Sequence, residues 1–210
     1  MKVLLVNGSP HEHGCTYTAL SEIERTLNAE GVETEVFWIG TKPISGCLDC
    51  GYCSKNDRCV MDDIVNDFVD KAWKADGFVF GAPVHYAGVP GSMTSFMNRA
   101  FYSGTRRGKG AFYLKPAATI VSARRAGTTA ALDQFGKYLL YQEMLTVGSR
   151  YWNMVHGYTP EDVRKDEEGL QIMRVLAKNL AYVLRLKEAG AAAGVRLPEP
   201  EEKIFTDFIR

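Results

Sequence analysis

Continuous apolar runs alternate with helical patterns along this chain, and no other feature limits its possible folds more strongly. Runs such as residues 2–7 (KVLLVN) and 77–82 (GFVFGA) are apolar at nearly every position, which is typical of strands buried on both faces. The pattern predicts strands over residues 2–7, 33–39, 77–82, 116–123 and 146–152, and helices over residues 16–30, 62–75, 91–102, 128–144 and 166–188. Strands joined through helices pair in parallel, so we expect a parallel sheet with helices on both faces.

Five such strands fit the α/β class and a doubly wound, three-layered, flavodoxin-like sheet with the strand order 2-1-3-4-5. A length of 210 residues suits one sizeable core. We therefore expect residues 1–190 to form a single domain, with residues 191–210 as a surface tail. Ligands in such sheets bind beyond the carboxyl ends of the strands, which makes the loops after the first, third and fourth strands the candidate binding loops.

Composition narrows the functional classes. The 25 Lys and Arg residues are balanced by 25 Asp and Glu residues, which argues against nucleic acid or an anionic membrane surface as the main partner. No stretch approaches the roughly 20 apolar residues of a membrane span, and the apolar run at the N-terminus is short for a secretory signal. We expect a cytoplasmic protein whose cysteines are not joined in a disulfide framework.

The loop after the first strand has the composition of an anion site. Glycine and hydroxyl residues follow the strand and open a helix, where backbone N–H groups and the helix dipole favour a negative charge. Neither the dinucleotide glycine triplet nor the Walker sequence occurs in it. An ordinary strand–helix turn with a capping threonine is the alternative. The candidate residues are Ser9, His11, Gly14, Cys15 and Thr16.

The loops after the third and fourth strands can border a flat ring, because glycines, an aromatic residue and backbone polar groups converge there. The alternative is that they are ordinary connections. The candidates are Pro83, Val84, His85 and Tyr86 in the first of these loops, and Ser122, Arg124 and Gly127 in the second.

The segments 8–16, 75–77 and 81–86 resemble the NADPH-dependent FMN reductase family over about residues 1–150. The resemblance implies that the first loop holds the FMN phosphate, that residues 83–86 lie against the isoalloxazine, and that residues 122–127 border it. His11 and Cys15 stand where that family usually has a basic residue and an asparagine.

Four of the five cysteines lie within thirteen residues, in the pattern C-x2-C-x2-C-x5-C. Thiolates select zinc, copper(I) or iron–sulfur clusters. Three cysteines at successive x2 spacings suit one face of a cubane cluster and a nearby fourth completes it, whereas structural zinc sites usually pair two knuckles across a longer span. An iron–sulfur cluster is the favoured interpretation, and zinc or a metal-free loop are the alternatives. The ligand candidates are Cys47, Cys50, Cys53 and Cys59.

Together with the flavin loops, this motif resembles the iron–sulfur flavoprotein family. The resemblance implies FMN, a 4Fe–4S cluster on the four cysteines, and a homodimer or homotetramer in which the cluster lies near a flavin. We expect an electron-transfer flavoprotein with a ferredoxin-like protein or NAD(P)H as redox partner, and no catalytic side chain. The alternatives are a cluster-free NAD(P)H-dependent FMN or quinone reductase and a redox-sensing protein. Residues 106–109 are interpreted as a solvated basic loop, with contact to an NADPH phosphate or an acidic partner as the alternative. Residues 151–154 are interpreted as core, and the alternatives are a roof over the flavin, the lining of a substrate pocket or an oligomer contact.

Overall fold

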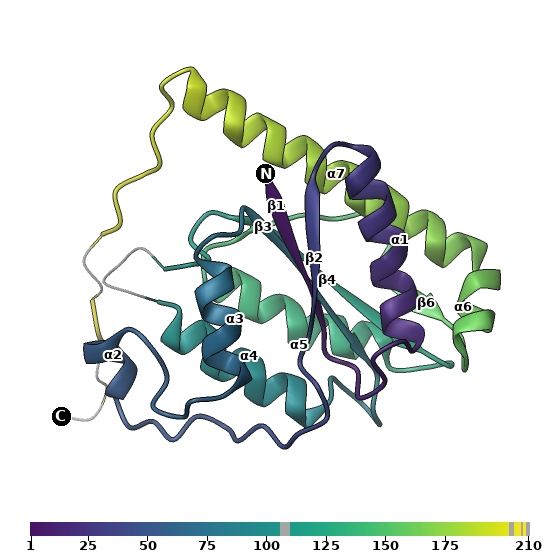
Figure 1. The fold of residues 1–210 in the computed structure, drawn as a ribbon, viewed down its shortest axis with the longest axis horizontal. Helices are drawn as coiled ribbons and strands as arrows, with labels where there is room; N and C mark the ends of the chain where they lie inside the picture. Colours follow the sequence, from purple (N-terminus) through teal and green to yellow (C-terminus); the bar gives the residue numbers. More distant parts are fainter. Residues whose placement is uncertain (106–109, 202–203, 207, 209–210) are drawn as a thin grey trace.

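A parallel sheet forms the centre of the computed structural model, which describes residues 1–105, 110–201, 204–206 and 208 (Figure 1). The strand order is β2-β1-β3-β4-β5, and a further strand, β6, also pairs with β4. The predicted α/β class and the order 2-1-3-4-5 are therefore confirmed. The basic residues 106–109 lie outside the described residues. The strands are β1 (Lys2–Asn7), β2 (Glu33–Trp38), β3 (Gly77–Pro83), β4 (Pro116–Ala123), β5 (Leu145–Thr146) and β6 (Met154–His156).

Helices cover both faces of the sheet. In Figure 1, α1 and α7 lie on one face and α3, α4 and α5 on the other. Among the described residues no helix is both long and apolar enough to cross a bilayer. The helices are α1 (Cys15–Ala29), α2 (Tyr52–Asn56), α3 (Ile64–Ala72), α4 (Gly91–Ser103), α5 (Thr128–Tyr141), α6 (Pro160–Lys165) and α7 (Glu167–Ala192).

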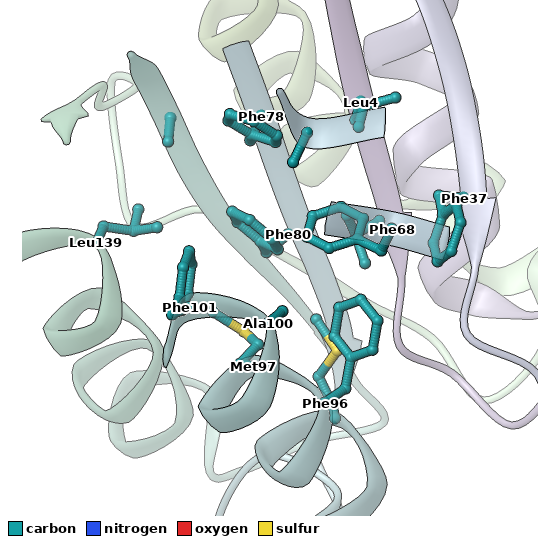
Figure 2. Packing of buried hydrophobic residues seen from close by; sticks show 14 of the residues in the cluster. Leu4, Phe37, Phe68, Phe78, Phe80, Phe96, Met97, Ala100, Phe101 and Leu139 are labelled. Carbon is teal, nitrogen blue, oxygen red and sulfur yellow. The ribbon is translucent and has the colours of Figure 1, made fainter. Parts of the chain in front are cut away.

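The two faces of the sheet bury different kinds of side chain. Along β1, Val3 and Leu5 face the aliphatic layer under α1 and α7, whereas Leu4 and Val6 face a layer rich in phenylalanine. In that second layer the Phe68 ring packs among several others, with a centroid 5.0 Å from that of Phe96 (Figure 2). Fully burying such a side chain is worth roughly 1.5–3 kcal/mol. This layer holds α3 and α4 firmly against the sheet.

The predicted fifth strand, residues 146–152, is wrong in its extent. β5 pairs with the first two residues of β4 and β6 with the last three, while residues 148–152 leave the sheet between them. An edge strand needs no second partner, so a polar, glycine-containing segment can leave it at low cost. Asn153 bridges the gap through its side chain, which donates to the Thr119 carbonyl at 3.1 Å.

The interpretation of residues 151–154 as core holds only for its last residue. Met154 is buried, but Tyr151 and Trp152 are exposed. Their rings pack on each other edge to face, with centroids 4.6 Å apart. They lie in the segment that leaves the sheet, and not at the end of a strand.

Several helix boundaries differ from the prediction: α5 ends at Tyr141 instead of residue 144, and α7 ends at Ala192 instead of residue 188. Asp63 caps α3 as expected, accepting a hydrogen bond from the Val65 amide, but the helix ends at Ala72 instead of residue 75. Helices α2 and α6 were not predicted. The start of α6 has a recognisable signal, because Thr159 and Asp162 form a reciprocal capping box around Pro160. By contrast, α2 is a five-residue helix with no buried side chain, so no periodicity could reveal it.

Candidate functional site

The Asn7 and Trp38 side chains fix the conformation of the loop between β1 and α1 through hydrogen bonds to its backbone. The Trp38 indole, at the end of β2, donates to the Ser9 carbonyl at 2.8 Å. The Asn7 side chain accepts from the Ser9 amide at 3.1 Å and donates to the Glu12 carbonyl at 2.9 Å. The Ser9 hydroxyl accepts from the His11 amide at 3.1 Å. These bonds shape the loop before any ligand binds, and the sequence reasoning missed Asn7 and Trp38.

Three helices that follow the candidate binding loops lack side-chain caps. No side chain caps α1, α4 or α5, whose N-cap residues are Gly14, Pro90 and Gly127. The other helices of six or more residues are capped by Asp63, Thr159 and Asp166. The first N–H groups of an uncapped helix need partners from outside the helix, and an anion is a favourable one. The start of α1 therefore offers its amides to a phosphate-sized ligand.

Buried polar contacts and close backbone packing join the first loop to its neighbours. The hydroxyls of Thr16 and Ser122 share a hydrogen bond of 2.9 Å, which links α1 to the end of β4. The Gly8 amide donates to the Gly81 carbonyl at 2.8 Å. A Cβ at Gly8 would lie 2.6 Å from the Met93 sulfur, so any larger residue would force the Met93 side chain to move. The structure thus places Ser9, Thr16 and Ser122 at one edge of the sheet.

The loop after β3 folds back on itself. The His85 and Gly88 backbones exchange two hydrogen bonds, of 2.9 and 3.3 Å, and Val84 pairs with the carbonyl of Ser122. Tyr86 stands at the tip, fully exposed, with a left-handed φ of 56°. Such a conformation costs energy in a bulky residue and is found most often at functional sites. The exposed ring is available to a flat ligand or to another chain.

Arg124 and Cys15 occupy different environments, although both were predicted to bind the cofactor. Arg124 is exposed and borders an open hollow of about 720 Å³ together with His156 and Tyr158, two residues that the sequence reasoning missed.

The Cys15 thiol donates to the Gly157 carbonyl at 3.6 Å. Burial raises the pKa of this thiol and the nearby acidic groups add to the effect. Cys15 therefore keeps its proton near neutral pH and faces the protein. His11 is exposed at the rim of the loop.

The four clustered cysteines line a single small cavity on the outer side of α4. All four are free thiols, and the cavity, about 20 Å³ in volume, is also lined by Arg99, Tyr102 and Ser103. Burial raises the pKa of the Cys53 thiol, and the other three thiols raise it further because they lie close to it. Among the residues that the structure describes, no three His, Cys, Asp or Glu side chains are already drawn together as a metal-binding group.

Tight turns bring the cysteines to this cavity. Asp49, Gly51 and Asp57 have left-handed backbones, with φ between 49° and 67°. The Gly51 turn starts α2, and the Asp57 turn ends it. Each turn reverses the chain within one or two residues, so residues 47–59 wrap around the cavity. Glycine adopts this conformation without strain, which suits Gly51 to its position at the start of α2.

The parallel sheet, the uncapped α1 and the loops that meet at the carboxyl edge define a flavin-dependent oxidoreductase with a flavodoxin-like fold. The chain belongs to the NADPH-dependent FMN reductase family, whose family model matches residues 1–159. The resemblance drawn from the sequence is thereby confirmed, and the family supports FMN as the flavin.

Relatives similar over most of the chain are named iron–sulfur flavoproteins. Iron-sulfur flavoprotein MJ1083 of Methanocaldococcus jannaschii is 29% identical over 195 residues, covering 89% of this chain and 98% of the relative. Iron-sulfur flavoprotein MJ0731 of the same organism is 28% identical over 202 residues, with 89% and 98% covered.

Solved structures show the same fold at low identity. FerB, a flavoenzyme NAD(P)H:(acceptor) oxidoreductase from Paracoccus denitrificans, superposes with a TM-score of 0.65 at 16% identity, covering 88% of this chain and 97% of FerB. A flavodoxin from the domain Archaea superposes with a TM-score of 0.59 at 16% identity, covering 88% of this chain and 99% of the flavodoxin.

Proposed function

We propose that this protein is an electron-transfer flavoprotein that uses FMN and a 4Fe–4S cluster to pass electrons between redox partners. The observation that carries the proposal is that four free thiols from one short segment line one cavity. The proposal agrees with the names of the two relatives described above.

The cysteine segment fits the cluster in its chemistry. Four thiols are the full ligand set of a cubane cluster, and none is tied up in a disulfide. The cavity is narrower than a cluster, so the segment would have to open on loading. Cys47 and Cys50 lie on exposed, irregular chain, where outward movement breaks few contacts.

The loops at the carboxyl edge fit FMN. The uncapped start of α1 and the Ser9 and Thr16 side chains would hold the phosphate. Residues 83–86 would lie along the isoalloxazine, and Ser122, Arg124 and Gly127 would border it. Bound FMN accepts two electrons as hydride or one at a time, whereas the cluster accepts one at a time. The chain's part is to bind, to orient and to exclude water, and no side chain needs to act as an acid or a nucleophile.

The two sites lie apart within one chain. The loop that would border the flavin ends where α4 begins, and the cysteine cavity lies against residues 99–103 of the same helix. At 1.5 Å per residue the sites are separated by about 13–20 Å along α4. Exposed apolar side chains line the cavity, namely Leu48, Val60 and Tyr102. Both features favour a homodimer or homotetramer in which a neighbouring copy covers the cavity and brings a flavin closer.

The test of the cluster is the visible spectrum of protein purified without oxygen, before and after dithionite, together with its iron and sulfide content. Flavin bands on a broad iron–sulfur absorption, both bleaching, are expected. Cys50→Ser should lose the iron, whereas Cys15→Ser should keep it, because Cys15 lies outside the cysteine segment. Flavin bands without iron in the wild-type protein would contradict the cluster.

The second candidate is a cluster-free NAD(P)H-dependent FMN or quinone reductase, which the description of the matching family favours. The two differ in their electron donors. Reduction of the bound flavin by a ferredoxin but not by NAD(P)H is expected for the electron-transfer protein. Rapid oxidation of NAD(P)H by protein without iron would support the reductase instead.

A further inference from the structure

We propose that Arg99 of α4 is a positioning residue for the cysteine cavity. By holding the Cys59 sulfur and placing a positive charge beside it, Arg99 raises the reduction potential of the cluster and slows its loss. The inference rests on the proposed function, because it concerns the group that the four cysteines would hold.

The Arg99 guanidinium is fully buried and uses both of its edges. Its Nε and Nη2 atoms each donate to the Cys59 sulfur at 3.3 Å. Its Nη1 and Nη2 atoms donate to the two carboxylate oxygens of Asp63 at 2.7 and 2.9 Å. The carbonyl of Met61 accepts a further bond at 3.2 Å. The Ser45 carbonyl accepts a longer bond from Nη1 at 3.5 Å. The side chain has 0% exposure, so its partners are protein groups and not solvent.

A second side chain fixes the backbone of the same cysteine. The Asn66 side chain on α3 accepts from the Cys59 amide at 2.9 Å and donates to the Cys59 carbonyl at 3.1 Å. Asn66 is itself 3% exposed. Cys59 is thus tied to α3 through its backbone and to α4 through its sulfur, whereas Cys47 and Cys50 lie on exposed chain. Two helices therefore anchor Cys59.

The acceptor of the Arg99 hydrogen bonds, the Cys59 sulfur, indicates the role of this arginine. A buried ion pair such as that of Arg99 with Asp63 seldom stabilises a fold more than apolar packing does, so the pair alone is a poor reason for a buried arginine. A neutral thiol is a weak acceptor, yet two of the guanidinium donors converge on one. Hydrogen bonds of a cation strengthen markedly when the acceptor is charged. A cysteine that binds iron carries that negative charge on its sulfur.

The sign of the effect on the potential follows from charge. Reduction adds one electron to the cluster, and a positive charge and hydrogen bonds at a ligand sulfur stabilise the added negative charge. Asp63 opposes this, since its carboxylate offsets the charge of Arg99. Replacing Arg99 by a neutral residue should therefore lower the potential, and replacing Asp63 by a neutral residue should raise it.

The variants are Arg99→Gln, Arg99→Lys and Asp63→Asn, in the anaerobically purified, full-length protein. Asparagine caps helices as well as aspartate does, so Asp63→Asn keeps the start of α3. The controls are Arg58→Gln and Asp62→Asn, which make the same charge changes in the same segment at side chains 50% and 84% exposed. FMN content and circular dichroism report folding.

The measurements are the cluster potential, by redox titration followed at the cluster absorption, and the rate at which that absorption bleaches with an iron chelator. We expect a lower potential and about tenfold faster loss for Arg99→Gln, the scale typical of residues that support metal ligands. Arg99→Lys, which keeps the charge but not the paired donors, should lose the cluster faster with a smaller change in potential. Asp63→Asn should raise the potential, and the controls should change little.

Equal potentials and loss rates in the variants, the controls and the iron-containing wild type would overturn this inference and leave the proposed function standing. If Arg99→Gln does not fold, the Asp63→Asn variant tests the inference alone. A cluster potential in Asp63→Asn that is equal to or below that of the wild type would contradict the charge argument. A wild-type protein that takes up no iron anaerobically would overturn the proposed function and the inference together.

Discussion

At the scale of single residues, Lys115 is a partly buried lysine whose charged group binds the end of a helix. It precedes β4, and its ammonium group donates to the carbonyls of Ala72 and Trp73 at 2.9 and 3.5 Å. These carbonyls belong to the C-terminal end of α3, where a positive charge is favourable. Burial is nevertheless the main influence on this group and, with repulsion from Lys187, lowers its pKa to about 8 against the opposing effect of Asp76.

This lowered pKa predicts how stability depends on pH. Between pH 8 and 10.5 the unfolded chain holds the proton that the folded protein has released, so the free energy of unfolding rises with pH. We expect the difference between wild type and Lys115→Met, from chemical denaturation, to rise by about 1–2 kcal/mol across that window, after allowance for solvent screening. It should stay constant from pH 6 to 7.5.

The control is Lys178→Met, which removes a lysine from an exposed position on α7. Its difference from wild type should not follow the same curve. A Lys115→Met difference that stays flat from pH 6 to 10.5 would show that the folded protein holds this proton as firmly as the unfolded chain does.

At the scale of elements, the helices of this protein differ in whether a side chain caps their N-terminus. Helices α3, α6 and α7 begin with side-chain caps, whereas α1, α4 and α5 begin without them. A glycine at the N-cap, as in α1 and α5, gives up about a few tenths of a kcal/mol relative to a capping Ser, Thr, Asn or Asp. That loss is offset if a ligand binds the free amides, which is the role proposed for α1.

Replacing Gly14 tests that role. Gly14 has an extended backbone that any residue can adopt, and Gly14→Asp and Gly14→Asn would introduce side chains of nearly the same shape that differ in charge. We expect the Asp variant to bind FMN at least about tenfold more weakly than the Asn variant, because its carboxylate repels the phosphate. Quenching of FMN fluorescence on titration into apoprotein measures both affinities.

The stability of the two apoproteins is the control, since both side chains can cap α1 and should leave their unfolding within about 1 kcal/mol of each other. Equal FMN affinities in the two variants would place the phosphate somewhere other than the start of α1.

At the scale of the whole molecule, the cysteine segment lies outside the layered core, on the outer side of α4 (Figure 1). The apolar residues around its cavity are exposed in the single chain. Large contiguous apolar patches are uncommon on monomers and often mark an interface. The proposed oligomer would bury this rim and shield the cavity from water and oxygen.

Light scattering after size exclusion should therefore give a mass of two or four times 23.3 kDa. The double variant Leu48→Lys with Val60→Lys should shift the protein towards the monomer, because it would place charges in the proposed interface. Leu186→Lys is the matched control, since Leu186 is comparably exposed but lies on α7, on the other face of the sheet. A monomeric wild type, or dissociation by the control alone, would contradict this arrangement.

The sequence by itself determined the class of fold and the places where a site could lie. Buried strands and amphipathic helices leave periodic signals, and parallel pairing brings the loops after β1, β3 and β4 to one edge whatever their detailed conformation. The spacing of the four cysteines likewise predicted that they act together, because ligands on one short segment need no distant contact to meet.

Only the tertiary structure decided the rest. Arg99 meets Cys59 across 40 residues of sequence, and Trp38 meets Ser9 across 29, so no local pattern could pair them. The division of the fifth strand into β5 and β6 depends on its position at the sheet edge, where one side lacks a neighbour to keep it straight. Local periodicity records which face of an element is buried, but the identity of its neighbours is set by how the layers pack, and that information is spread over the whole chain.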